Sequence, residues 1–201
     1  MKHLIFPSSV IASAFIFLSG CASYNASSLN TLTSEAVFSS VEKQDLIVVA
    51  KTFDPSDCKR YLDRNVIAEG YQPVQLYIEN NSDKDYIFSL NRISLPFVRS
   101  EEVAKKVHTS TVGRAVGYGV GALFLWPFAI PAIVDGIKSS EANQALDNDF
   151  STKAASDQVI SSHSYFNKLL FVPINDYQPN FRITLIEKDS KKIKEVEVLP
   201  S

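Results

Sequence analysis

Two groups of short strand-like runs, separated by a stretch with helical spacing, constrain the fold of this 201-residue chain more than any other feature. The runs cover residues 46–50, 74–79 and 86–97 in the first group and 169–172, 181–185 and 193–199 in the second. Short runs of this kind with turn residues between them are typical of antiparallel sheets. The pattern predicts a mainly β, α+β domain over 44–200, an immunoglobulin-like antiparallel β-sandwich.

Two details of the first group predict local structure. The run 46–50 is apolar at every position, which predicts a strand that is buried on both faces. Farther on, the alternation changes phase near Asn91 and Arg92, which predicts a bulge or a bend.

Residues 101–156 interrupt the strands and predict a helical insertion. Glu101 and Glu102 stand where a helix N-terminus favours negative charge, and apolar residues follow at helical spacing as far as Arg114. A further helix start is expected at 139–141, because apolar residues then recur at every fourth position through residue 154.

The centre of the insertion is a run of twenty uncharged residues, 115–134, between Arg114 and Asp135. A straight helix of that length would extend ~30 Å, the thickness of a bilayer core. However, two prolines each remove a helix donor and clash with the preceding turn. We therefore predict a hairpin, with a first helix to about Trp126 and a second from about Ile133.

Glycine recurs at every fourth position in the first arm of this hairpin, which leaves one helix face bare enough for close helix packing. The possible membrane or helix-packing face comprises Gly113, Gly117, Gly121, Trp126, Pro127 and Pro131. Three interpretations stay open: a buried hairpin that covers one sheet, a segment that contacts lipid, and an element that assembles copies into a homo-oligomer. We favour the buried hairpin, because a sandwich with one uncovered apolar face needs a cover.

The N-terminus has the layout of a secretory signal, with Lys2 and His3 before an apolar run that ends at Leu18. Leu18-Ser19-Gly20-Cys21 resembles the lipobox of bacterial lipoproteins. This resemblance implies that residues 1–20 are a cleaved signal peptide and that Cys21 carries diacylglycerol and an N-terminal acyl group such as palmitate. It also implies processing and sorting by the lipoprotein machinery. Because Ala22 rather than aspartate follows the cysteine, the resemblance implies a lipid anchor in the outer membrane, with the domain facing the periplasm.

After the lipidated residue, the composition predicts a flexible tether over 21–43. Ten of the nineteen residues from Ala22 to Ser40 are Ser, Asn or Thr, without a period. Beyond it, Cys58 would be the single remaining thiol of the mature chain, and we expect it to be buried.

Several functions lack support in the sequence. The formal net charge of −2 provides no excess positive field for nucleic acid. His108 and His163 have no other ligands at metal-binding spacing, so we expect no metal and no cofactor besides the covalent lipid. A hydrolase is a lesser alternative, and it would require any two of His108, His163, Asp57 and the serines near them to converge in one cleft.

Three segments, 71–82, 103–111 and 135–143, are together similar to a family of uncharacterised lipoproteins of Gram-negative bacteria. This family has no known activity that the resemblance could carry over to the chain. The resemblance implies that the sandwich, the insertion and the acidic helix form one unit. We therefore expect a non-enzymatic binding or scaffolding module with an unidentified envelope protein as partner, or alternatively an element that inserts into the membrane or self-assembles through 113–137.

Overall fold

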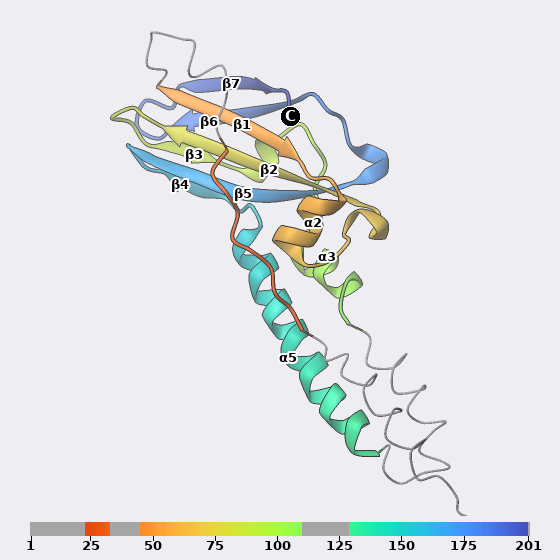
Figure 1. The fold of residues 1–201 in the computed structure, drawn as a ribbon. Helices are drawn as coiled ribbons and strands as arrows, with labels where there is room; N and C mark the ends of the chain where they lie inside the picture. The colour runs from red at the N-terminus through yellow and green to blue at the C-terminus, as the bar shows by residue number, and fades with distance from the viewer. Residues whose placement is uncertain (1–22, 33–44, 110–128, 201) are drawn as a thin grey trace, which may run out of the picture. The chain divides into compact units, whose positions relative to one another are not determined.

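The computed structural model describes residues 23–32, 45–109 and 129–200 of the chain. Its described strands form two antiparallel sheets, and three α-helices accompany them (Figure 1). The expected mainly β, α+β class is therefore confirmed. Residues 24–108 and 143–200 belong to one compact unit, and residues 129–142 belong to another.

The first sheet has the order β1-β2-β5, formed by β1 (Leu46–Thr52), β2 (Tyr71–Asn80) and β5 (Ser164–Pro173). The second has the order β4-β3-β6-β7, formed by β4 (Gln158–Ile160), β3 (Tyr86–Phe88), β6 (Phe181–Glu187) and β7 (Ile193–Val198). The α-helices are α2 (Pro55–Leu62), α3 (Ser100–Lys106) and α5 (Ala129–Lys153). Three short 3-10 helices, η1 (Ile67–Glu69), η2 (Leu90–Arg92) and η4 (Ile174–Asp176), lie in the connections.

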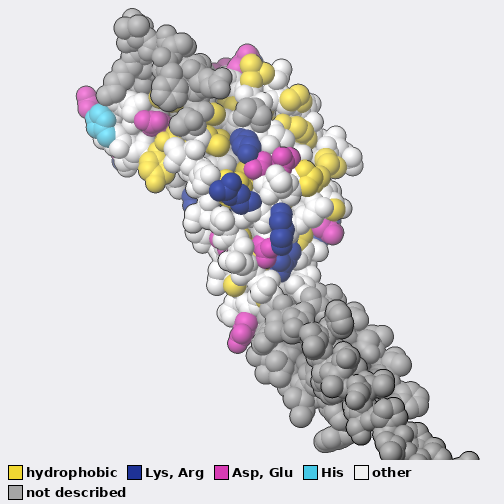
Figure 2. All heavy atoms as spheres, in the orientation of Figure 1, with side chains coloured by type: hydrophobic (Ala, Val, Ile, Leu, Met, Phe, Trp, Pro, Cys, Tyr) yellow, Lys and Arg dark blue, Asp and Glu magenta, His cyan; other side chains and the backbone are white. Residues whose placement is uncertain are grey.

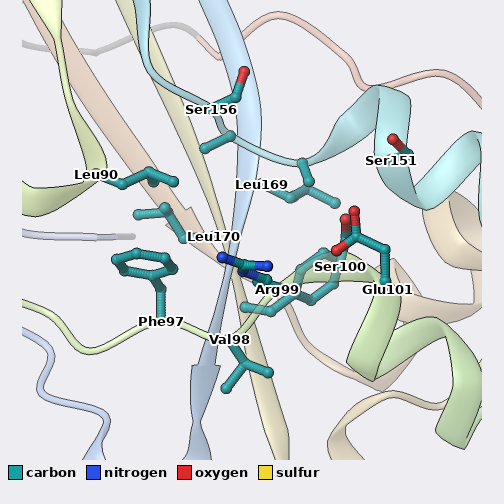
Figure 3. Close-up of a pocket in the computed structure, with 13 residues that line it drawn as sticks. Leu90, Phe97, Val98, Arg99, Ser100, Glu101, Ser151, Ser156, Leu169 and Leu170 are labelled. Atoms are coloured by element: carbon teal, nitrogen blue, oxygen red, sulfur yellow. The ribbon is translucent and has the colours of Figure 1, made fainter.

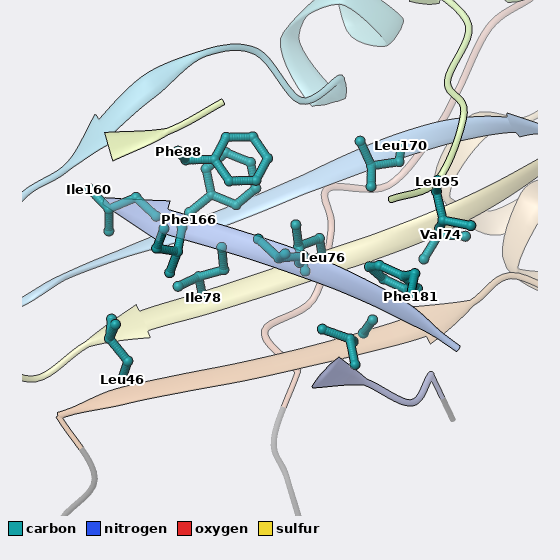
Figure 4. Close-up of a cluster of buried hydrophobic side chains, with 14 of the residues drawn as sticks. Leu46, Val74, Leu76, Ile78, Phe88, Leu95, Ile160, Phe166, Leu170 and Phe181 are labelled. Atoms are coloured by element: carbon teal, nitrogen blue, oxygen red, sulfur yellow. The ribbon is translucent and has the colours of Figure 1, made fainter. Parts of the chain in front are cut away.

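One hydrophobic core is shared by the two sheets (Figure 4). Val74, Leu76 and Ile78 alternate along β2 and are completely buried in it, as their spacing predicts. Phe88 and Ile183 of the other sheet belong to the same core. The rings of Phe88 and Phe166 lie 4.3 Å apart, so the core joins residues of both sheets.

A second apolar cluster covers part of the other face of the first sheet. It joins α2, α3 and the last turns of α5 to the ends of β2 and β5. Phe150 of α5 stacks on Phe171 of β5, with ring centroids 5.6 Å apart. These helices supply the apolar cover that the sequence analysis assigned to the hairpin, whose first arm lies outside the described residues.

Cys58 lies on α2 within this second cluster and is completely buried, which confirms the expectation. Burial raises the pKa of its thiol to about 11. The thiol is therefore protonated at neutral pH.

Two sequence predictions for the strands have different outcomes. The expected bend near Asn91 and Arg92 is confirmed, because η2 occupies 90–92 and the chain then resumes sheet contact through a bridge between Ile93 and Ile183. The prediction that the first strand is buried on both faces is wrong, since Ile47 and Val49 are half-buried. The apolar strand residues of the second cluster come from β2 and β5, so the helices do not extend over β1.

The helix boundaries also differ from the prediction. The expected restart at Ser139 does not occur, and α5 continues without a break from Ala129 to Lys153, four residues before the expected start at Ile133. Pro131 is the third residue of α5, where the backbone N–H would have no acceptor within the helix, so the proline does not end it. In turn, α3 ends at Lys106, earlier than the expected Arg114.

Candidate functional site

Residues 24–30, which we call the docked segment, run along the two-sheet domain (Figure 1). The backbone N–H of Ser27 donates to the carbonyl of Arg60 at 2.8 Å. At the far end of the segment, the carbonyl of Asn30 accepts from Gln75 Nε2 at 2.7 Å and from Asn167 Nδ2 at 3.2 Å. Composition predicted a flexible tether over 21–43. Within it, residues 24–30 are held on the domain, chiefly through backbone groups, and residues 33–43 lie outside the described residues.

Lys153, at the end of α5, is the polar centre of this docking. Its ammonium donates to the carbonyl oxygens of Ser27 at 2.8 Å and Tyr61 at 2.7 Å, and to the Asp149 carboxylate at 2.6 Å. Three acceptors use all three ammonium protons, which is how a lysine that is 7% exposed is stabilised inside a protein.

Tyr24 begins the docked segment. Its hydroxyl donates to the same Asp149 carboxylate. Burial, followed by the contact with Asp149, raises the pKa of the Tyr24 phenol, so the hydroxyl remains a donor throughout the neutral range. The Arg64 guanidinium lies over the Tyr24 ring, 5.5 Å from its centre, which is close enough for a cation–π contact.

The end of α2 provides the other contact of the docked segment. The helix begins with a capping box between Asp54 and Asp57 and ends at Asp63, which adopts the left-handed conformation with φ of 50°. The Asp63 carboxylate accepts the backbone N–H of Asn25 at 3.1 Å and pairs with Lys59. Although partial burial opposes the change, these hydrogen bonds lower the pKa of Asp63 below its ordinary value.

The chain enters or leaves the two-sheet unit at three points, and all three lie at α5. Tyr24 bonds to Asp149, His108 Nε2 lies 2.7 Å from the Asp147 carboxylate, and the chain re-enters the unit at Asn143. These helix positions lie within about 9 Å along the helix axis, at 1.5 Å per residue. The three boundary residues of this unit, Tyr24, His108 and Asn143, therefore lie at one place on the domain.

Most residues of the predicted site cannot be placed. Cys21, Gly113, Gly117, Gly121, Trp126 and Pro127 lie outside the described residues, and Pro131 lies in the first turn of α5. Among the described helices, none combines the length and the apolar character that a membrane crossing demands. The sequence analysis missed Tyr24, Asp149 and Lys153 as site residues. The sequence feature that could have indicated two of them is the four-residue spacing of Asp149 and Lys153 on a helix.

A second candidate site is a pocket of about 270 Å³ beside β5, which we call the β5-edge pocket (Figure 3). Leu169, Leu170 and Phe171 form its floor and are buried. Leu90 and Phe97 add apolar walls, and Phe97 is 37% exposed at the mouth. The pocket combines these apolar walls with polar lining residues, which are Arg99, Ser100, Glu101, Ser151 and Ser156.

Backbone pairing fixes the walls of this pocket. On one side, the N–H of Val98 donates to the Phe171 carbonyl at 2.7 Å, and on the other, the N–H of Ala155 donates to the Leu169 carbonyl at 2.8 Å. The Asp157 carboxylate accepts the Leu90 N–H at 2.8 Å, which joins η2 to the segment after α5. The pocket is therefore formed without any ligand.

The residues named for a hydrolase each bond to a different partner. His108 pairs with Asp147, His163 Nε2 lies 2.9 Å from Asp83, and Asp57 pairs with Lys51 at 2.7 Å. The structure shows no hydrogen bond or ion pair that joins any two of these three described residues.

Comparisons with protein-family models, with curated proteins and with solved structures found no match to this chain.

Proposed function

We propose that the protein is a lipid-anchored envelope protein of the outer membrane that acts as a non-enzymatic binding or scaffolding module. One observation carries the proposal: the segment that docks on the domain begins at Tyr24, three residues after the proposed acylation site Cys21. Three residues span at most about 10 Å. Acyl chains on Cys21 would therefore hold the α5 side of the domain close to the bilayer surface, and two or three such chains give stable attachment.

The proposal includes the finer form of the fold. The two antiparallel sheets face each other across one core, which supports an immunoglobulin-like sandwich. The insertion between β3 and β4 would then carry the helical hairpin, of which α5 is the second arm. Binding partners would meet the sandwich on its periplasmic side, and the β5-edge pocket is the candidate binding site.

Metabolic labelling with a palmitate analogue tests the anchor. The wild-type chain should take up the label, a Cys21→Ser variant should not, and a Cys58→Ser variant should remain labelled. A wild-type chain without label would show that the lipid anchor is wrong.

A second candidate function is membrane insertion or self-assembly through 113–137. It is favoured by the contacts of Tyr24 and His108, which both bond to α5, because a hairpin that follows His108 beside an acyl anchor would enter the same membrane. The test is a Cys21→Ser variant exported through an ordinary cleavable signal and washed with alkaline carbonate. A soluble variant would assign the anchor to the acyl chains alone, whereas retention in the membrane would show that 113–137 contacts lipid.

A further inference from the structure

Two side chains of opposite charge line the β5-edge pocket. The Arg99 guanidinium and the Glu101 carboxylate both line it, and neither has a hydrogen-bond or ion-pair partner among the described side chains (Figure 3). Both residues are exposed to solvent at the pocket. They also form no ion pair with each other, so both remain available to a ligand.

We propose that this pocket binds the zwitterion of a small apolar amino acid. The proposal deepens the binding-module part of the proposed function and rests on it. A ligand carboxylate would pair with Arg99, whose planar guanidinium matches that group. The ligand ammonium would pair with Glu101, and the apolar side chain would contact Leu90, Phe97 and Leu170.

The charge pattern selects this class of ligand over its neighbours. A purely anionic molecule would face repulsion from Glu101, and a purely cationic molecule would face repulsion from Arg99. A zwitterion satisfies both groups. The volume of about 270 Å³ lies just below the ~300–1,000 Å³ that is common for drug-sized ligands, which favours a small ligand.

The walls support a defined binding geometry. Val98 and Ala155 hold opposite sides of the pocket to the backbone of β5, so little ordering is required when a ligand enters. Ser151 and Ser156 also line the pocket and offer hydroxyl groups to the polar end of the ligand.

The test is isothermal titration calorimetry on the full mature protein, lipidated and held in detergent, with three probes. L-leucine has both charges, N-acetyl-L-leucine lacks the ammonium, and L-leucinamide lacks the carboxylate. We expect L-leucine to bind with an affinity about tenfold higher than either analogue, because each analogue loses one charge-assisted hydrogen bond. Equal affinities for all three probes, or no saturable binding of L-leucine, would overturn the proposal.

Two variants test whether Arg99 binds the ligand carboxylate and Glu101 binds the ligand ammonium. Arg99→Gln should weaken the binding of L-leucine about tenfold and should not weaken that of L-leucinamide, whose ammonium Arg99 repels. Glu101→Gln should weaken the binding of L-leucine in the same way and should not weaken that of N-acetyl-L-leucine, whose carboxylate Glu101 repels. Arg182→Gln is the matched control, because it removes an exposed guanidinium that pairs with Glu195 and Glu197 on β7. If Arg99→Gln and Arg182→Gln have the same affinity for L-leucine, Arg99 is not part of the site.

Palmitate labelling and membrane fractionation of the same samples separate the two proposals. A protein that is labelled and sediments with membranes but does not bind L-leucine overturns the ligand assignment alone. A protein that binds L-leucine without the label overturns the anchor alone.

Discussion

Tyr24 and Asp149 lie 125 residues apart in the chain, and the hydroxyl of the first donates a hydrogen bond to the carboxylate of the second. The same carboxylate accepts from Lys153, which also holds the carbonyl of Ser27. One polar cluster therefore fastens the docked segment to the end of α5. Because this segment directly follows the proposed anchor, the cluster would determine how close to the membrane the domain is held.

Tyr24→Phe should loosen the docked segment and keep the rest of the fold. The variant removes a hydrogen bond to a charged group, which contributes about 1.5–3 kcal/mol. We expect the free energy of urea unfolding to fall by that amount or less, and the amide of Ser27 to exchange its hydrogen faster in the native protein. Tyr165→Phe is the control, because Tyr165 is 66% exposed and contributes its ring to a stack with Tyr77. Unchanged exchange at Ser27 would contradict the role given to Tyr24.

Lys153→Met should lower the free energy of unfolding more than a substitution at the surface does. The substitution keeps an unbranched side chain but leaves the carbonyls of Ser27 and Tyr61 without the ammonium and Asp149 without its cation. Breaking a buried pair in this way costs about 3–5 kcal/mol. Lys168→Met is the matched control, because its ammonium donates to the exposed carbonyl of Thr152, and we expect a loss below about 1 kcal/mol. Equal losses for the two variants in urea unfolding would show that Lys153 is not the centre of the cluster.

The sequence predicted those parts of the fold that depend on local pattern. The alternation in β2 identifies the strand and its core face, because the side-chain period of a strand is two residues. The docked segment could not be predicted in this way. Its bonds join Asn30 to Asn167 and Tyr24 to Asp149, and a polar segment gives no periodic signal of what it contacts.

The start of α5 and the β5-edge pocket show two further reasons why the sequence did not predict parts of the structure. Pro131 was read as a helix breaker from its type alone, although its effect depends on its position in the first turn of α5. The β5-edge pocket is formed by segments around Val98 and Ala155 that approach β5 from opposite ends of the insertion. The sequence does not show that these two segments meet on one strand.

Cys58 should be unreactive in the folded protein. Burial raises the pKa of its thiol to about 11, so a very small fraction is the nucleophilic thiolate at pH 8. In a Cys21→Ser background, Cys58 is the single thiol, and we expect alkylation by iodoacetamide to be slow until urea unfolds the chain. A Ser190→Cys variant is the positive control, because that residue is exposed before β7. Rapid alkylation of Cys58 at zero urea would mean that α2 opens readily from the second cluster.

Acid should weaken the docking through Asp63. Its pKa in the folded protein is lowered from 3.8, so its ionised carboxylate stabilises the fold above that pH, and the contribution is lost as the pH falls through 3.8 toward the folded value. We expect Asp63→Asn to lower the free energy of unfolding at pH 7 and to reduce the further loss between pH 5 and about pH 3. An Asp189→Asn variant, changed at an exposed position of the turn before β7, should keep the wild-type acid dependence. Because the pKa values of Asp54 and Asp85 are lowered as well, part of the acid loss should persist in Asp63→Asn. If urea unfolding gives the same pH profile for Asp63→Asn and the wild type, then the bond from the Asn25 N–H to Asp63 does not hold the docked segment.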